Sequence, residues 1–370
     1  MRHSTCDRQH SICMSQKEST IMDPISQNIR FHPLPWKSGS WQMPNRFRSL
    51  FLVTMITLLT SSLAVAEEEA PEPPPKPRSV ELEAKRGVSL NAIYYEGTEG
   101  EATVPVVVIH DWNQKEDGTT YETLAEYLQS KGYAVILPDL RGHGDSTKQK
   151  ISGRSRTLEP NNVRPENVIS GDLEAVRMFL LEENNAKRLN LSATTLIGVG
   201  KSAILAAYYA IYDWDPNVRG GNTRASTQRR GGNEDVKALV LISPARKIGK
   251  QMKIDALARH PDIGSGEVST LILVGQKQVD GKSNKPKETK ESKTAESIFV
   301  KLKQNGHETE SRDVGKRTLF LNVIDTELNG EKLVNETNLD LKARETVRAF
   351  LNLRLRDRSI PWSERTPYKD

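Results

Sequence analysis

Cysteine is nearly absent from this 370-residue chain, and its two cysteines, Cys6 and Cys13, lie close to the N-terminus. Both precede the segment that we interpret below as a secretory signal, so the exported protein would contain no thiol. A chain without thiols forms no disulfide, performs no thiolate catalysis and binds no metal through cysteine. The cleavage site also lacks a cysteine, which argues against a lipoprotein.

Histidine is scarce as well, with seven in the whole chain. Only His110, His143, His260 and His307 follow the signal, and they are scattered along the sequence. A protein metal site needs histidine, cysteine or carboxylate ligands at a recurring short spacing, and no such set is apparent. We therefore predict that the protein has neither a metal site nor a cofactor.

A long hydrophobic run is also missing. The most apolar segment, Leu50–Leu63, is interrupted by Thr and Ser, and it is shorter than the roughly 20 apolar residues that cross a membrane. Met43 and two arginines precede it and Ala64-Val65-Ala66 follows it, an order typical of a secretory signal peptide. We predict export to the periplasm or the medium, with no stable membrane insertion after cleavage. An uncleaved signal anchor is the alternative.

The remaining domain boundaries follow from this signal peptide, residues 43–66. Residues 1–42 are polar and irregular, and we interpret them as a disordered extension or as the result of a start codon assigned too far upstream. Residues 67–78 form a linker rich in Pro and Glu, which we expect to be extended. Residues 79–356 are long enough for one large domain, and residues 357–370 form a C-terminal tail.

Positive charge is concentrated outside the predicted domain. The formal net charge is +5, but residues 1–66 carry seven basic and three acidic residues, which leaves the remainder close to neutral. The basic isoelectric point therefore reflects the targeting segment and does not indicate nucleic-acid binding. No protein partner can be identified from the sequence.

Apolar runs that predict strands alternate with segments of helical spacing along the domain. The predicted strands are Val80–Lys85, Leu90–Tyr95, Val104–Ile109, Tyr133–Leu137, Thr194–Ile197, Val236–Ile242, Thr270–Val274 and Leu319–Val323. The predicted helices are Thr119–Ser130, Pro165–Glu183, Lys201–Tyr212, Thr294–Gln304 and Leu341–Leu353. This alternation predicts an α/β fold, with a mostly parallel sheet of about eight strands and helices on both faces. Polar inserts at 215–235 and 279–293 are interpreted as surface loops, and no large lid is expected.

One strand runs directly into a helix through a very tight turn, Gly198-Val199-Gly200-Lys201-Ser202. Glycine accepts a positive φ without steric cost, so Gly200 suits the centre of such a turn. The Gly-Lys-Ser triplet also ends a phosphate-binding P-loop, but Thr195 stands where that motif requires its first glycine. The simplest alternative is a glycine-rich turn without any catalytic relevance.

A second motif, Asp139-Leu140-Arg141-Gly142-His143-Gly144-Asp145-Ser146, resembles a loop common in esterases and serine peptidases. With the tight turn and the order of elements, it makes residues 80–353 resemble the α/β-hydrolase superfamily, which includes esterases, dienelactone hydrolases and serine peptidases. The resemblance implies the α/β-hydrolase fold. It also implies a mainly structural role for this loop.

The resemblance places the catalytic triad at Gly200, Gln278 and Asn329, where the family has a nucleophile, an acid and a histidine base. Glycine has no nucleophilic group, and an amide does not accept a proton near neutral pH. We therefore expect no catalytic residue in a degenerate triad, and a protein that acts by binding a ligand or partner. The alternative is an active carboxylic-ester hydrolase with a displaced nucleophile such as Ser202.

The same resemblance places Asp111 and Trp112 in the family's oxyanion loop. Asp111 replaces a glycine there, and an acid that points inward would repel a developing negative charge. The helix that begins near Lys201 presents free backbone N–H groups, and Gly200 leaves room for a ligand beside them. We expect a small anionic ligand at Asp111, Trp112, Gly200 and Lys201. An empty, vestigial pocket is the competing interpretation.

Overall fold

The computed structural model describes residues 73–113, 115–215, 234–277, 288–336 and 342–365. The described residues belong to one compact unit. The predicted extension and signal peptide lie outside the described residues, as do residues 216–233 and 279–287 of the two predicted polar loops. No helix of the described ranges is both long enough and apolar enough to cross a lipid bilayer.

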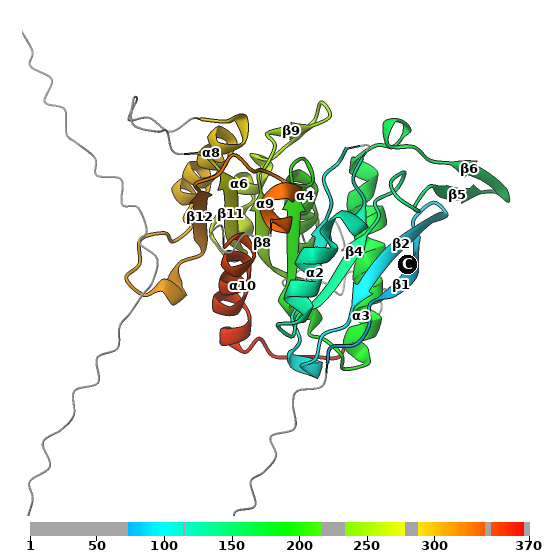
Figure 1. The fold of residues 1–370 in the computed structure, drawn as a ribbon, viewed down its shortest axis with the longest axis horizontal. Helices are drawn as coiled ribbons and strands as arrows, with labels where there is room; N and C mark the ends of the chain where they lie inside the picture. Colours follow the sequence, from blue (N-terminus) through cyan, green and yellow to red (C-terminus); the bar gives the residue numbers. More distant parts are fainter. Residues whose placement is uncertain (1–72, 114, 216–233, 278–287, 337–341, 366–370) are drawn as a thin grey trace, which may run out of the picture. The chain divides into compact units, whose positions relative to one another are not determined.

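Ten strands of the described residues form one sheet, in the order β12-β11-β8-β7-β3-β4-β2-β5-β6, with β1 paired to β2 (Figure 1). The six strands from β12 to β4 are parallel, and β1, β2, β5 and β6 join them antiparallel. The strands are β1 Arg78–Ala84, β2 Val88–Tyr95, β3 Pro105–Ile109, β4 Ala134–Pro138, β5 Lys148–Ile151, β6 Arg154–Thr157, β7 Thr194–Val199, β8 Val236–Ile242, β11 Ser269–Gly275 and β12 Leu319–Ile324. A separate two-stranded sheet pairs β9 Lys247–Ile248 with β10 Met252–Lys253.

Helices cover both faces of the sheet, because the central strands are apolar on both sides. One core contains side chains of α3, α4, α6, α7 and α8, and the other contains side chains of α2, α9 and α10. The helices are α2 Glu122–Gln129, α3 Leu173–Asn185, α4 Ser202–Trp214, α6 Ala256–Arg259, α7 Pro261–Gly264, α8 Lys290–Gln304, α9 Glu331–Asn335 and α10 Ala343–Arg354. A π-helix, η4 Val168–Asp172, leads into α3.

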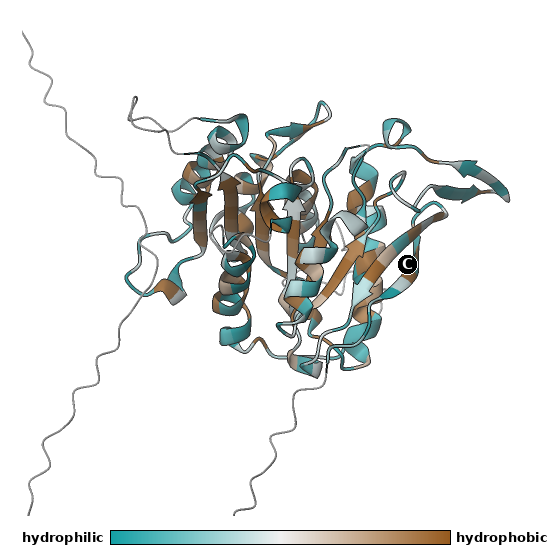
Figure 2. Ribbon diagram, viewed as in Figure 1, coloured by the Kyte–Doolittle hydropathy of each residue, from teal (hydrophilic) through white to brown (hydrophobic). Residues whose placement is uncertain are grey.

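Side chains of β3 alternate between the two cores, as the strand geometry requires. Val107 and Ile109 belong to one core, and Val106 and Val108 belong to the other. All four are essentially inaccessible to solvent. Figure 2 shows these central strands as the most hydrophobic part of the ribbon, whereas the β5–β6 hairpin is hydrophilic. The continuous apolar runs in the sequence therefore mark strands that are covered on both faces.

The structure confirms the predicted α/β architecture and contains all eight predicted strands. To the main sheet it adds β5 and β6, whose sequences are mostly polar and gave no strand signal, and it adds the separate pair of β9 and β10. One prediction was wrong at its boundary: residues 290–293, assigned to a polar loop, form the first turn of α8. Thr289 caps that helix, because its Oγ1 accepts a hydrogen bond from the Ser292 amide at 3.0 Å.

The parallel strands all end at one edge of the sheet, and the chain reverses its direction of winding between β3 and β7. From β3 the chain adds β4 on one side, and then β7, β8, β11 and β12 on the other. Ligands of open α/β sheets bind at the carboxyl ends of the strands beside such a switch point. The fold therefore directs attention to the residues that follow β3 and β7.

Candidate functional site

The turn between β7 and α4 is as tight as the sequence predicts. Gly200 has φ +57°, a backbone conformation that favours glycine. Gly198 allows close packing within the same turn, since a Cβ there would lie 2.6 Å from the Cα of Ala203. Gly200 thus permits the backbone conformation of the turn, and Gly198 permits the close contact with Ala203.

The space in front of Gly200 is filled by the carboxyl group of Asp111. A Cβ on Gly200 would lie 2.5 Å from the Asp111 Cγ and 2.6 Å and 2.7 Å from its two oxygens. The Lys201 amide, the first beyond this turn, donates a hydrogen bond to Asp111 Oδ1 at 2.7 Å. Asp111 therefore points inward, into the place that a side chain at position 200 would need.

The surroundings of Asp111 combine opposing effects on its charge. Burial raises the pKa of the Asp111 carboxyl above its ordinary value of 3.8, and the nearby Glu116 carboxylate raises it further. The hydrogen bonds from the Lys201 amide and from Asn113 Nδ2, the latter at 3.3 Å, act in the other direction. Asn113 Nδ2 also lies 2.8 Å from Glu116 Oε1, so this amide links the two acids.

An open cleft of ≈ 810 Å³ lies beside this turn, lined by residues that include Trp112, Asn113, Glu116, Lys201 and Glu331. Lys201 Nζ donates a hydrogen bond to the Trp112 carbonyl oxygen at 3.4 Å, which joins the two sides of the cleft. The predicted ligand-binding residues are therefore neighbours in the structure. Ligand binding by them stays a prediction.

Asn329 lies near the carboxyl ends of β8 and β11. Its Oδ1 accepts hydrogen bonds from the Ser243 hydroxyl at 2.9 Å and from the Gly275 amide at 3.2 Å. Ser243 Oγ in turn accepts a hydrogen bond from the Gly330 amide at 2.9 Å. The side chain of Asn329 thus acts as a structural connector between loops. Gln278, the predicted acid position, lies outside the described residues.

Ser243 was not singled out as a functional residue from the sequence. It follows β8 directly and has φ +46°, an uncommon conformation for a residue with a side chain. Strained residues often mark functional sites. Here the hydroxyl donates to an amide oxygen, which cannot act as a general base, so the geometry gives Ser243 no means of activation. The only sequence signal was its place at the end of a buried strand.

Ser202, the alternative nucleophile, is the first residue of α4 and is fully buried. Its Oγ has no hydrogen-bond partner among the described residues. A serine nucleophile needs both access to substrate and a base within hydrogen-bond reach. Ser202 has neither in the described structure.

His110 is the histidine nearest the turn, and both of its ring nitrogens contact backbone groups. His110 Nε2 accepts a hydrogen bond from the Leu140 amide at 3.1 Å, and its Nδ1 lies 3.0 Å from the Asp111 carbonyl oxygen. Burial lowers the pKa of His110 to about 3, so the ring is neutral and Nδ1 carries its proton. Burial also lowers the pKa of His143, whose ring centre is 4.9 Å from that of His110. Among the described residues, neither ring has a hydroxyl partner.

The loop 139–146 is held rigidly in place, as the resemblance implied. Asp139 accepts hydrogen bonds from the Gly118 amide at 2.7 Å and from the Asp145 amide at 2.9 Å. Arg141 binds Asp172 through Nε at 2.8 Å and Nη2 at 2.6 Å, with both side chains almost fully buried. These contacts tie the loop to the short 3₁₀-helix Gly118–Tyr121 before α2 and to the π-helix before α3.

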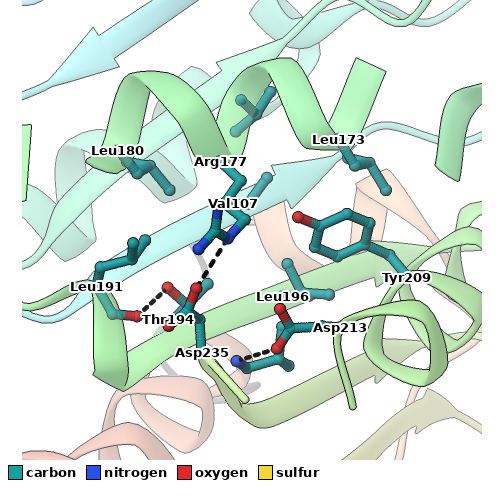
Figure 3. Close-up of a pocket in the computed structure, with 12 residues that line it drawn as sticks. Val107, Leu173, Arg177, Leu180, Leu191, Thr194, Leu196, Tyr209, Asp213 and Asp235 are labelled. Carbon is teal, nitrogen blue, oxygen red and sulfur yellow. Dashed lines mark hydrogen bonds and ion pairs between the residues drawn. The ribbon is translucent and has the colours of Figure 1, made fainter. Parts of the chain in front are cut away.

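A smaller cavity lies beneath α3 and α4, away from the turn (Figure 3). Arg177 of α3 forms an ion pair there with Asp235, at 2.8 Å. The cavity volume of ≈ 10 Å³ is about that of one water probe. It is therefore part of the core and not a ligand site.

Within the described ranges, no group of three or more His, Cys, Asp or Glu residues is arranged so that it could hold a metal ion. Neither a protein-family model nor a curated protein sequence matches the chain.

Solved structures do match. A thermostable carboxylesterase cloned from a metagenomic library superposes with a TM-score of 0.50 at 14% identity, over 77% of this chain and 91% of its own. An esterase of Pyrobaculum calidifontis gives 0.48 at 15%, over 82% and 88%, and the dienelactone hydrolase of Anabaena variabilis gives 0.45 at 15%, over 76% and 98%. At these identities the likeness concerns the fold alone. The superposition on the carboxylesterase and the strand order, with its tight β7–α4 turn, lead to one conclusion: this chain has the α/β-hydrolase fold.

Proposed function

We propose that this protein is a non-hydrolytic member of the α/β-hydrolase fold, which acts by binding a ligand in the cleft beside the β7–α4 turn. One observation carries the proposal: Asp111 occupies the space that a nucleophilic side chain at position 200 would need. Glycine at this position supplies no nucleophile, and the neighbouring carboxylate leaves no room for one.

Two further features support the loss of hydrolysis. The Lys201 amide is the donor that would stabilise a developing oxyanion, and it already donates to a carboxylate. Asn329 stands at the predicted base position and cannot take a proton from an attacking group. Ester hydrolysis from Ser202, the alternative, is not supported, since that hydroxyl is buried without a partner among the described residues.

The cleft itself supplies the means of binding. Trp112 offers an aromatic surface, Lys201 a positive charge, and Glu116 and Glu331 negative charges. A small anion at the start of α4 would have to displace the Asp111 carboxylate from the Lys201 amide. We therefore expect the natural ligand to contact Trp112 and Lys201 Nζ and to leave the Lys201 amide to Asp111.

Hydrolysis is tested with the purified full chain, p-nitrophenyl acetate and a fluorophosphonate probe, beside the variants Ser202→Ala and Ser243→Ala. We expect no labelling, and no turnover above that of either variant. Turnover that disappears in one of the variants would identify a working nucleophile and reject the proposal.

Ligand binding in the cleft is tested by a thermal-shift screen of small metabolites. A ligand of the cleft should shift the melting temperature of the wild type but not of Trp112→Ala or Lys201→Gln. Lys253→Gln, which removes an exposed lysine of β10, is the matched control and should respond like the wild type. Equal responses of all variants would place the ligand elsewhere.

We also propose that the protein is exported, with residues 43–66 as a cleaved signal peptide. The order of basic, apolar and small residues in the sequence supports this.

A further inference from the structure

We propose a second binding site, specific for a phosphate group, between the β5–β6 hairpin and the segment 162–167. A cavity of ≈ 320 Å³ opens there, lined by Arg86, Arg141, Gln149, Arg156 and Arg164 among others. It shares no lining residue with the cleft beside the β7–α4 turn. The proposal is therefore independent of the function proposed for that cleft.

The charge around this cavity is positive and uncompensated. Arg86, Arg156 and Arg164 come from three different segments, and none of them has a carboxylate partner within the described residues. No Asp or Glu of the described chain lines the cavity. Positively charged groups that line one cavity repel one another, so an anion is the expected occupant.

The arginines are placed by a defined framework. Gln149 is buried and donates from Nε2 to the Arg86 carbonyl oxygen at 3.0 Å, and the Lys150 amide donates to the Gly87 carbonyl oxygen at 2.7 Å. Arg86 itself has φ +69°, a conformation that its neighbours must hold in place. These contacts fix the turn between β1 and β2 against the hairpin.

Arg141 forms the floor of the site. It is 3% exposed, and its described side-chain hydrogen bonds, to Asp172, use Nε and Nη2. Asp172 neutralises this arginine, so the net charge facing the cavity comes from the three exposed arginines. A buried, hydrogen-bonded arginine in the wall distinguishes the cavity from a chance group of surface charges.

The chemistry of the lining favours phosphate. Each guanidinium presents a planar fork of N–H donors that matches two oxygens of a phosphate group, and three such forks suit a group with several charged oxygens. The amides of Asn162 and Asn167 add neutral donors to the wall. A soluble phosphorylated compound and the headgroup of a phospholipid share this chemistry.

The hairpin supplies a matched control for the test. Successive side chains of a strand point to opposite faces, so Lys148 and Lys150 lie on the face of β5 opposite to Gln149 and Ile151, which line the cavity. The variant Arg156→Gln/Arg164→Gln removes two charges from the cavity. The variant Lys148→Gln/Lys150→Gln removes two charges from the same hairpin but not from the cavity.

Titration calorimetry of the full chain with inorganic pyrophosphate measures the affinity. We expect saturable binding that weakens about a hundredfold in the double arginine variant, since loss of a charge-assisted hydrogen bond costs about tenfold in affinity for each arginine. The lysine variant should bind within about twofold of the wild type, since it loses only long-range attraction. Unchanged thermal melting of both variants verifies that the fold is intact.

Vesicles of phosphatidylcholine with and without phosphatidic acid separate the two sources of phosphate. Arginine-dependent binding to the phosphatidic acid vesicles would identify a lipid headgroup, and pyrophosphate binding without vesicle binding would identify a soluble ligand. The proposal is rejected if neither probe binds, or if the lysine and arginine variants lose affinity equally.

Discussion

At the scale of single residues, the contact between Asp111 and the β7–α4 turn decides what the cleft can do. Sequence reasoning placed an acid in the oxyanion loop but could not give its direction. The structure shows the carboxylate turned inward and bound to the Lys201 amide. The Asp111 carboxylate thus occupies the position at which the sequence predicted a small anionic ligand.

This arrangement predicts that Gly200→Ala is costly. The left-handed backbone of Gly200 costs about 1–2 kcal/mol for an L-residue. Displacement of the half-buried Asp111 carboxylate, with loss of its hydrogen bond from the Lys201 amide, adds a similar amount, so we expect about 3 kcal/mol less unfolding free energy in a urea titration. Gly249→Ala is the control, because Gly249 has φ +61° and open space around its Cβ position. It should lose only about 1 kcal/mol.

A double-mutant cycle tests whether Asp111 causes part of the free-energy cost of Gly200→Ala. Asp111→Ala removes the three atoms that a Cβ on Gly200 would meet. Gly200→Ala should therefore cost about 1 kcal/mol less in the Asp111→Ala background than in the wild type. Strict additivity would mean that Asp111 does not occupy this space.

At the scale of elements, the loop after β4 depends on one buried ion pair. Asp172, in the π-helix η4, is inaccessible to solvent and accepts three hydrogen bonds from Arg141, including one from its backbone amide at 2.9 Å. Because the loop 139–146 follows β4 directly, this pair sets where the loop leaves the sheet.

Asp172→Ala should therefore destabilise the protein by about 3–5 kcal/mol, since it leaves a buried guanidinium without its partner. Chemical denaturation measures the loss. Glu101→Ala breaks the exposed ion pair with Lys187 and serves as control, with an expected change below about 1 kcal/mol. Similar effects of the two substitutions would contradict the role given to the buried pair.

Individual helices and strands also show where prediction from the sequence succeeds and where it fails. Runs such as Val104–Ile109 predicted strands well, because burial on both faces demands apolar, β-branched residues. The β5–β6 hairpin gave no such signal, since it projects from the sheet and needs little apolar surface. The start of α8 was missed for a similar reason: Lys290 and Glu291 are polar, and the capping role of Thr289 was not recognised.

For the whole molecule, the order of elements was predictable, but the arrangement of the site was only partly so. The resemblance implied that Asp111 and Gly200 share one site, and their proximity follows from the pairing of β3 with β7. The connector formed by Ser243 and Asn329 depends on loops after β8 and β12, whose paths no periodic pattern specifies. The arginine-lined cavity combines segments that are far apart in sequence and also gave no signal.

The proposed export can be tested on the whole molecule. The chain produced in a secreting bacterial host should appear outside the cytoplasm with Glu67 as its first residue, as measured by mass spectrometry of the N-terminal peptide. Ala66→Lys should block cleavage, because the signal peptidase requires a small residue there. An exported chain that retains residues 43–66 would instead support the uncleaved anchor.

The inward carboxylate of Asp111 also prevents hydrolytic chemistry from being built into this scaffold one substitution at a time. A serine introduced at position 200 alone meets an occupied space, and removal of Asp111 alone exposes the Lys201 amide without a nucleophile to use it. A histidine in place of Asn329 would in turn sever the connection to Ser243 and Gly275. No change yields activity by itself, so directed evolution by single steps should stall, and an active variant has to be reached by simultaneous substitution.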